Sequence, residues 1–167
     1  MVASGPAEED ARPYPGRGLV LPGKTWQLSG MRDFSLFGDQ HVRQYEETGG
    51  KVGHAWNDTQ VLILHVKGRK SGETRKVPLI YGRDGDDYAI VASKGGAPAH
   101  PGWYLNLQAH PDATIQVWDK LLPVRAHTAT PEERARVWSI MTKEWPEYDR
   151  YQAKTEREIP VVLLSPR

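Results

Sequence analysis

Short apolar runs separated by turn residues constrain the fold of this chain more than any other feature. The run from Val61 to Val66 is nearly unbroken, and it predicts a strand over Thr59–Val66 that is buried on both faces. Lys76–Tyr81 alternates in side-chain direction, and an RDGDD turn follows it. Tyr88–Ala92 then runs back, so we expect these two segments to form a hairpin.

Three more apolar runs follow towards the C-terminus. Ala113–Trp118 and Leu121–His127 flank the dipeptide Asp119-Lys120, which predicts a second hairpin. Ile159–Leu164 reads IPVVLL and predicts a last buried strand. Because the strands follow one another mainly as hairpins, the sheet is expected to be antiparallel rather than doubly wound.

Helix signals lie between these strands. Phe34–Thr48 carries apolar residues at helical spacing before two glycines, and Pro101–Ala109 predicts a second, shorter helix. A third helix begins after Thr130, where Glu133 completes a capping box, and it runs to about Glu144. The predicted fold class is therefore α+β, a small antiparallel barrel with peripheral helices.

The N-terminal residues differ in composition from the rest of the chain. They are rich in glycine, proline and charge, so residues 1–29 are predicted to form a mobile arm and residues 30–167 a single domain. Within the arm, Gly18–Thr25 reads GLVLPGKT and matches the phosphate-loop pattern of nucleotide-binding proteins. No buried strand precedes it and Pro22 stiffens its middle, so we interpret the match as a coincidence.

Composition excludes several functional classes. The chain has 22 lysines and arginines against 21 acidic residues, so it lacks the global positive field of non-specific nucleic-acid binders. Cysteine is absent, and the six histidines lack the close spacing of zinc ligands, so no metal site is expected. No apolar run reaches membrane-spanning length and no signal peptide is recognisable, which favours a cytoplasmic location. Contact of the N-terminal arm with a membrane surface stays open.

Three motifs are suited to anion or ligand binding. Gly68–Lys76 reads GRKSGETRK and joins four cations to flexible backbone, although a charged hairpin turn would look the same. Ser93–Gly96, SKGG, follows a strand and is either an anion-binding nest or a plain connector. In His100–Leu107, HPGWYLNL, core packing explains the aromatic residues but not Asn106. With no nucleophile elbow or catalytic carboxylate pair, this is the pattern of a protein whose cofactor carries the chemistry.

Between Phe34 and Pro166 the chain carries, in order, GRKSG, R-x-x-P-L, ASKGG, HPxWYLNL and YxxYQxxTxRxIPVV. This series resembles the deazaflavin-dependent nitroreductases of actinobacteria, in the flavin and deazaflavin oxidoreductase superfamily. The resemblance implies a split β-barrel that binds coenzyme F420, a deazaflavin with a phosphodiester and an oligoglutamate tail. It also implies an oxidoreductase that transfers a hydride from reduced F420 to a nitroaromatic, a quinone or an activated enone.

The resemblance assigns roles to individual residues. The cofactor's phosphate and tail would be held by Arg69, Lys70, Ser71, Gly72 and Arg75. Its ring and ribityl chain would be lined by Val77, Pro78, Ala92, Ser93, Lys94, Gly95, Gly96, Trp103, Tyr104, Asn106 and Leu107. The acceptor would meet Trp145, Tyr148 and Tyr151, which share a helical face in WPEYDRYQ. Tyr151 would be the main hydroxyl donor to acceptor oxygens and Tyr148 the secondary one.

Several alternatives stay open. An FMN-dependent oxidoreductase would have the same fold, an F420-binding carrier would lack turnover, and a phosphate-loop NTPase would use Gly18–Thr25. The family commonly has tyrosine where this chain has Trp145, and an aromatic residue where it has Ile80. These departures leave the physiological acceptor open, and the sequence does not decide between a monomer and a homodimer.

Overall fold

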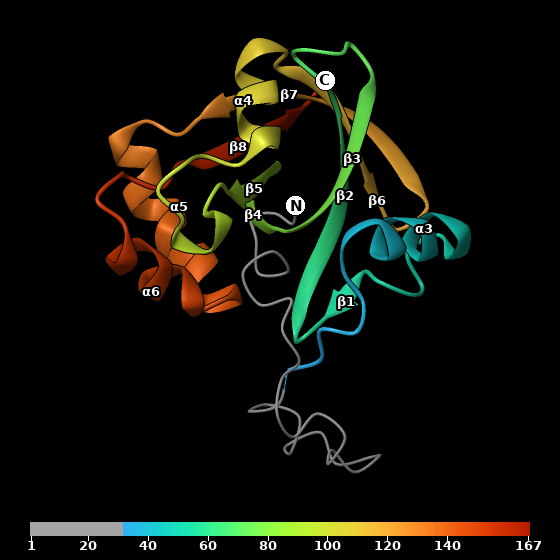
Figure 1. The fold of residues 1–167 in the computed structure, drawn as a ribbon, viewed down its shortest axis with the longest axis horizontal. Helices are drawn as coiled ribbons and strands as arrows, with labels where there is room; N and C mark the ends of the chain where they lie inside the picture. The colour runs from blue at the N-terminus through green and yellow to red at the C-terminus, as the bar shows by residue number, and fades with distance from the viewer. Residues whose placement is uncertain (1–31) are drawn as a thin grey trace.

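The computed structural model describes residues 32–167, so the predicted arm and its GLVLPGKT motif lie outside the described residues. Figure 1 shows a strongly curled sheet with helices around it. The strands are β1 (Ala55–Trp56), β2 (Thr59–Lys67), β3 (Thr74–Ile80), β4 (Gly82–Asp84), β5 (Asp87–Val91), β6 (Asp112–Val117), β7 (Lys120–Thr128) and β8 (Val161–Pro166). The helices are α3 (Gly38–Thr48), the 3-10 turn η2 (Lys94–Gly96), α4 (Gly102–Ala109), α5 (Pro131–Glu144) and α6 (Glu147–Lys154).

The sheet is antiparallel at every pairing. Its order is β1-β2-β6-β7-β8-β5-β4, and β3 pairs with β2. The β6–β7 hairpin was predicted, and the last strand lies between β7 and β5 in the middle of the sheet. The structure therefore confirms the predicted α+β class with a curled antiparallel sheet.

The partner of β3 differs from the prediction. We expected the segment from Lys76 to pair with Tyr88–Ala92, but β3 runs beside β2, with Val77 opposite Leu64. The RDGDD turn instead closes the short β4–β5 hairpin, and the chain bends at Tyr81. The longer pairing prevails because GRKSGE is itself a tight turn. Within it, the Gly68 N–H donates to the Glu73 carbonyl at 2.8 Å.

Helix ends follow their local signals with one exception. The N-cap of α5 has the predicted capping box, in which the Thr130 hydroxyl and the Glu133 carboxylate each accept a hydrogen bond from the other's backbone N–H. In contrast, α3 begins at Gly38 rather than at Phe34. The Phe34 side chain precedes the helix and packs on Trp56, with ring centroids 5.5 Å apart. Its burial reflects tertiary packing and not helical periodicity.

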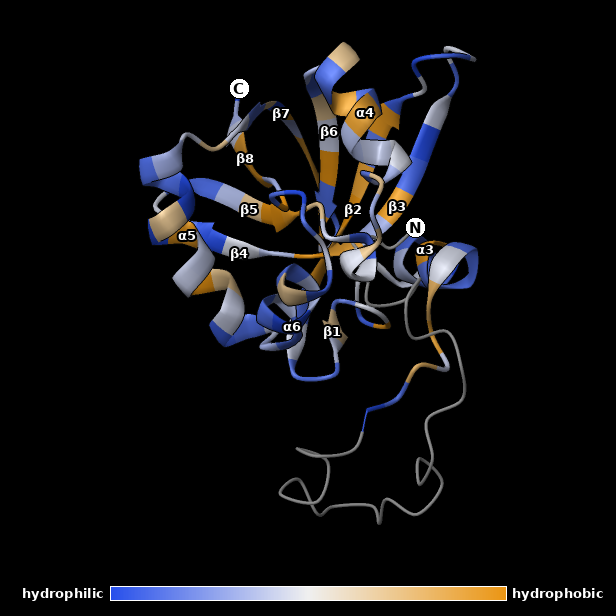
Figure 2. Cartoon of the chain, turned by 60° about the vertical axis from the view of Figure 1, so that its left-hand side comes forward, coloured by the Kyte–Doolittle hydropathy of each residue, from blue (hydrophilic) through white to orange (hydrophobic). Residues whose placement is uncertain are grey.

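Two apolar layers lie on opposite faces of the curled sheet. Alternate residues of one strand divide between them: Leu64 packs in the layer beneath α4, whereas its neighbour Ile63 packs in the layer beneath α3, α5 and α6. Figure 2 shows the strand interiors as hydrophobic and the turn between β2 and β3 as hydrophilic. This arrangement places the basic turn beside α4. Among residues 32–167, no helix is both long and apolar enough to span a bilayer.

Candidate functional site

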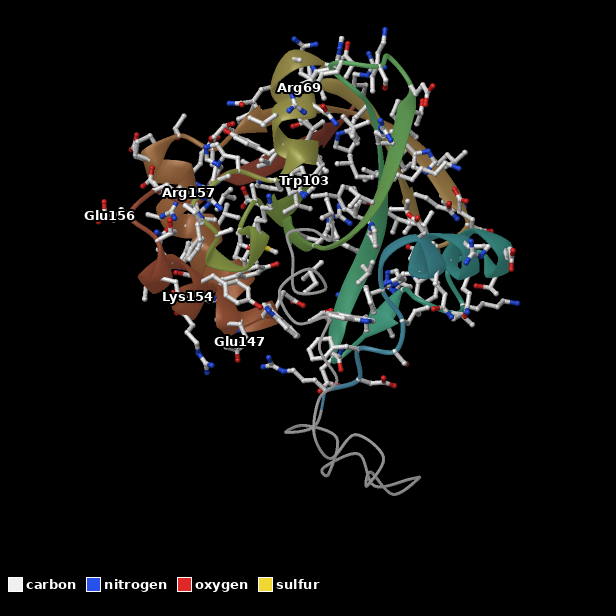
Figure 3. The ribbon with its side chains drawn as sticks, viewed as in Figure 1. Arg69, Trp103, Glu147, Lys154, Glu156 and Arg157 are labelled. Atoms are coloured by element: carbon white, nitrogen blue, oxygen red, sulfur yellow. The ribbon has the colours of Figure 1, made fainter. Side chains whose placement is uncertain are left out.

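A pocket of about 330 Å³ opens between the β2–β3 turn and the first turns of α4. Its walls combine the predicted phosphate and tail residues with part of the predicted ring groove. The lining residues are Gly68, Arg69, Lys70, Ser71, Arg75, Lys76, Val77, Gly102, Trp103 and Asn106. Figure 3 shows Arg69, from the β2–β3 turn, beside α4, and Trp103 at the start of that helix. The structure thus brings together residues that are more than thirty positions apart in sequence.

The Ser-Gly pair shapes the basic turn. The Ser71 hydroxyl accepts a hydrogen bond from the Glu73 N–H at 3.1 Å, and Gly72 adopts a left-handed φ of 77°. A Cβ at Gly68 would lie only 2.8 Å from the Ser71 Oγ. The turn is therefore tight enough to direct Arg69 and Lys70 to one side, where they line the pocket.

Asn106, which core packing did not explain, joins the basic turn to α4. Its Oδ1 accepts a hydrogen bond from the Arg69 guanidinium at 2.8 Å and a second from the Arg69 backbone N–H at 3.0 Å. The amide oxygen is neutral, so it orients Arg69 without cancelling its charge. Asn106 is therefore a structural support for the pocket as well as part of its wall.

The pocket has an excess of positive charge. Within the described residues, no carboxylate lies in salt-bridge range of Arg69, Lys70 or Arg75. Lys76 differs because its Nζ lies 2.8 Å from a carboxylate oxygen of Glu46 on α3. Three cations without a carboxylate partner among the described residues, beside a glycine-containing turn that permits close approach, make a site that attracts phosphate or carboxylate.

Trp103 supplies a polar group with which no other described residue pairs. The indole is buried at the pocket wall, and its Nε1 donor has no hydrogen-bond partner among the described residues. A buried donor without a partner costs roughly 1–3 kcal/mol. An acceptor atom on a bound ligand would remove that cost, so this donor fits a pocket that is filled by a polar molecule.

Other predicted ring-groove residues do not line this pocket. Tyr104 and Leu107 line a separate cavity of about 100 Å³, where the Tyr104 hydroxyl hydrogen-bonds the Thr128 hydroxyl at 2.8 Å. Pro78 is buried opposite Ile63 in the β2–β3 ladder. Because side chains alternate along a strand, Pro78 faces away from Val77.

Of the predicted ASKGG residues, Ala92 and Ser93 follow β5, and Lys94, Gly95 and Gly96 form the turn η2. This segment packs against α6 rather than lining the basic pocket. A Cβ at Gly96 would lie 2.6 Å from the Tyr151 carbonyl oxygen, so only glycine permits the approach. The turn therefore packs directly on the backbone of Tyr151, one of the predicted acceptor residues on α6.

The three predicted acceptor residues form one buried group. The exposed fractions of Trp145, Tyr148 and Tyr151 are 1%, 0% and 3%. The Trp145 indole N–H donates to the Tyr151 hydroxyl at 3.3 Å, and the two tyrosine rings are 6.1 Å apart. The Tyr148 hydroxyl has no hydrogen-bond partner among the described residues, and burial raises the pKa of this phenol well above its usual value. It therefore stays protonated and is a hydrogen-bond donor without an acceptor.

Sequence reasoning omitted two kinds of residue. Lys76 and the flanking Gly68 line the pocket, and both belong to the GRKSGETRK motif, so extending the predicted site along that motif would have included them. Arg157 donates hydrogen bonds to three backbone carbonyls around η2. Its only sequence signal is its place in the TxRxIPVV motif. Within residues 32–167, no group of three or more His, Asp or Glu residues could hold a metal ion.

Comparison with known proteins gives consistent matches. Residues 38–166 match the family described as F420H(2)-dependent quinone reductase. An F420H(2)-dependent quinone reductase of Mycobacterium tuberculosis is 44% identical over 131 residues, which cover 76% of this chain and 88% of the relative. A solved F420-H2 dependent reductase is 42% identical, with a TM-score of 0.59, over 63% of this chain and 93% of its own.

A second solved structure, described as a domain-swapped dimer, is 39% identical, with a TM-score of 0.62, over 76% of this chain and 95% of its own. These matches confirm the predicted split-barrel fold, the resemblance to deazaflavin-dependent reductases and F420 as the cofactor. The chain belongs to the F420H(2)-dependent quinone reductase family.

Proposed function

We propose that this protein transfers a hydride from F420H2 to a quinone, using the basic pocket to hold the anionic part of the cofactor. Membership of the quinone reductase family supports the reaction and the acceptor class. The observation that carries the cofactor site is the pocket itself, in which Arg69, Lys70 and Arg75 have no carboxylate partner among the described residues. A phosphodiester and a glutamate tail present the anionic groups that these cations complement.

The residues present fit such a ligand. Arg69 is held in place by Asn106, so its guanidinium is oriented before the ligand arrives. The unpaired Trp103 Nε1 donor at the wall can pair with an acceptor atom of the ligand. Ser71 and Gly72 form the turn that exposes Lys70. This preorganisation means that little ordering cost is left for the binding step.

The chemistry then depends on placement. When bound, reduced F420 supplies a hydride, that is, two electrons in one step. The protein's part is to hold the acceptor close to the donor atom and to stabilise the negative charge that develops on the acceptor oxygens. We assign the second task to Tyr148 and Tyr151. Both are buried in a layer of aromatic and apolar side chains.

Tyr148 is the stronger candidate of the two in this structure. Its hydroxyl is protonated and has no partner among residues 32–167, whereas the Tyr151 hydroxyl accepts from Trp145. A quinone oxygen would supply the missing acceptor. Because the exposed fraction of Tyr148 is 0%, an acceptor reaches this hydroxyl only after neighbouring side chains rearrange.

Binding and turnover should be measured separately. Purified protein is titrated with oxidised F420 and, in parallel, with FMN, following ligand fluorescence. Reduced F420 is then mixed with enzyme and menadione, a nitroaromatic or no acceptor, and its oxidation is followed by absorbance. We expect F420 to bind more tightly than FMN and menadione to support the fastest oxidation. Tight F420 binding without turnover on any acceptor would indicate a carrier, and preferential FMN binding would contradict the proposal.

A further inference from the structure

Arg157 makes three side-chain hydrogen bonds to backbone carbonyls around the turn η2. Its guanidinium donates to the carbonyl oxygens of Ser93 at 2.7 Å, Ala97 at 2.8 Å and Ala92 at 3.3 Å. It also lies 3.0 Å from the His100 Nδ1. One side chain from the loop between α6 and β8 therefore contacts four positions within a nine-residue segment, 92–100.

Arg157 is itself held in place. Its backbone carbonyl accepts a hydrogen bond from the Gln152 Nε2 at 2.8 Å, and the Gln152 Oε1 accepts from the Ile159 N–H at 2.9 Å. Gln152 lies on α6, so the loop that carries Arg157 is fixed to that helix. The guanidinium is half-buried, and this burial lowers the pKa of Arg157 from its usual value. The guanidinium nevertheless stays charged, and this charge strengthens its hydrogen bonds to the carbonyls.

The segment that Arg157 contacts needs an external constraint. Lys94, Gly95 and Gly96 are consecutive residues with left-handed φ values of 47°, 64° and 85°. A left-handed lysine is a strained conformation that persists only where surrounding contacts impose it. Within the turn, two hydrogen bonds link the Gly96 N–H to Ser93 and the Ala97 N–H to Lys94. From outside the turn, α6 packs against Gly96, and the Arg157 guanidinium adds hydrogen bonds to the flanking carbonyls.

The same segment leads directly into the pocket wall. His100 lies two residues before Gly102, the first residue of α4, and its ring packs edge-on against Tyr104 with centroids 5.0 Å apart. Gly102 and Trp103 line the 330 Å³ pocket. Because the Arg157 guanidinium has only donors, His100 accepts through Nδ1 and is neutral in this arrangement. Figure 3 shows Arg157 and Trp103 on the two sides of this segment.

We propose that Arg157 is a positioning residue for the F420H2 reaction: it fixes residues 92–100 and thereby places the first turn of α4 against the cofactor. The inference rests on the proposed function, because the ligand of the pocket is taken to be F420. Arg157 acts through the backbone of the segment and through His100. It does not line the pocket itself.

The test uses Arg157→Gln and Arg157→Lys in the full chain. Lysine keeps the charge but its single nitrogen cannot span the three carbonyls, so both variants should fix residues 92–100 less well. If the glutamine variant does not fold, the lysine variant alone is measured. The first readout needs no cofactor: amide hydrogen exchange at Gly96 and Ala97, which should speed up about tenfold or more. The second is the dissociation constant for oxidised F420, which should rise about tenfold. In turnover, KM for F420H2 should rise while KM for the quinone stays the same.

Arg136→Gln is the matched control. Arg136 lies on α5, pairs with Asp84 at 2.7 Å and does not touch residues 92–100. It should leave all three readouts unchanged. Wild-type exchange rates at Gly96 and Ala97 together with an unchanged F420 dissociation constant in folded Arg157 variants would overturn the inference. If wild-type protein itself fails to bind F420, the proposed function fails, and the inference fails with it.

Discussion

A single oxygen atom, the Asn106 Oδ1, accepts both the Arg69 guanidinium at 2.8 Å and the Arg69 backbone N–H at 3.0 Å. The two bonds join the β2–β3 turn to α4 across 37 positions of sequence. Since Arg69 and Lys70 come from the turn and Trp103 from α4, this contact determines how the two walls of the pocket face each other. These hydrogen bonds hold the two walls in place without a bound ligand.

Replacing Asn106 with alanine should therefore weaken cofactor binding. One hydrogen bond from the charged guanidinium, worth roughly 1.5–3 kcal/mol, and one from the backbone N–H, worth roughly 0.5–1.5 kcal/mol, are lost. We expect the dissociation constant for F420 to rise about tenfold or more. Gln108→Ala, on the same helix but bonded to Tyr104, is the control. Equal affinity in the two variants, measured by fluorescence titration, would show that the turn positions itself without Asn106.

Lys70 and Arg75 should control cofactor affinity rather than hydride transfer. Neither has a carboxylate partner among residues 32–167, and both line the pocket. Lys70→Ala or Arg75→Ala should raise the F420 dissociation constant about tenfold, because each loses one charge-assisted contact. The rate at saturating cofactor should change little. High salt should reproduce the effect in wild type, since such charges are screened over about 10 Å at 0.1 M salt.

An exposed arginine of α3, Arg43, gives the control for those two variants. Arg43→Ala removes the same charge at a position outside the pocket wall. If it weakens F420 binding as much as Arg75→Ala does, the general field of the protein attracts the cofactor, and the pocket assignment is wrong.

Glu46 should oppose cofactor binding. Its carboxylate lies 2.8 Å from the Lys76 Nζ and 3.8 Å from the His65 Nε2, so it neutralises part of the pocket's charge. Glu46→Gln should release Lys76 for the ligand. A partly exposed pair is worth roughly 0.2–1 kcal/mol, so the F420 dissociation constant should fall by up to about fivefold. Glu47→Gln, the next residue along the helix, is expected to have less effect, and a tighter complex in that variant alone would contradict the assignment.

The sequence predicted those parts of the fold that depend on local signals. The capping box of Thr130 and Glu133 specified the start of α5, and the apolar run of β2 specified a strand buried on both faces. The choice of partner for β3 was wrong, because both flanking turns looked suitable for a hairpin. The hydrogen-bonded GRKSGE turn and the length of the resulting ladder, which is a property of the whole pairing, together favour β2.

The site was predicted unevenly for a similar reason. Charge and glycine identified the basic turn, but the role of Asn106 depends on α4 docking against that turn. Arg157 acts on carbonyls some sixty positions earlier in the chain. Every residue has a backbone carbonyl, so the amino-acid sequence contains no pattern that indicates such a contact. The family motif included Arg157 but did not indicate its role.

Four histidines should make the fold less stable in acid. Burial lowers the pKa values of His41, His54, His65 and His100 below the usual 6.5. Below about pH 6.5 the unfolded chain therefore binds more protons than the folded one, and the free energy of unfolding falls as the pH falls towards the folded pKa values. Above that pH this contribution is fully present. Urea unfolding at about pH 7.5 and 5.5 should show the loss.

The contribution of one residue can be isolated at His41. Its exposed fraction is 3%, and its Nε2 hydrogen-bonds the Gly53 carbonyl at 2.8 Å. Glutamine at this position retains an N–H donor but does not titrate. His41→Gln should reduce the dependence of unfolding free energy on pH between these two conditions. An unchanged pH dependence would show that His41 is not one of the groups responsible.

Tyr148 allows the catalytic and packing roles of the α6 tyrosines to be separated. Its hydroxyl is buried without a partner among residues 32–167, so Tyr148→Phe removes an unsatisfied group and should leave the free energy of unfolding equal or raise it by about 1–3 kcal/mol. If the hydroxyl donates to the quinone oxygen, the same variant should lose turnover, with about 10²-fold as an upper guide. Its F420 affinity should stay the same.

Tyr151→Phe is the comparison, because the Tyr151 hydroxyl accepts from the buried Trp145 indole at 3.3 Å. Losing that acceptor should lower the free energy of unfolding by roughly 1–3 kcal/mol, whatever happens to turnover. The two variants are therefore expected to differ: Tyr148→Phe should be stable but have a low turnover rate, whereas Tyr151→Phe should be less stable. Full turnover with menadione in Tyr148→Phe would remove this hydroxyl from the mechanism. A loss of turnover in a variant that is as stable as wild type could not be attributed to unfolding.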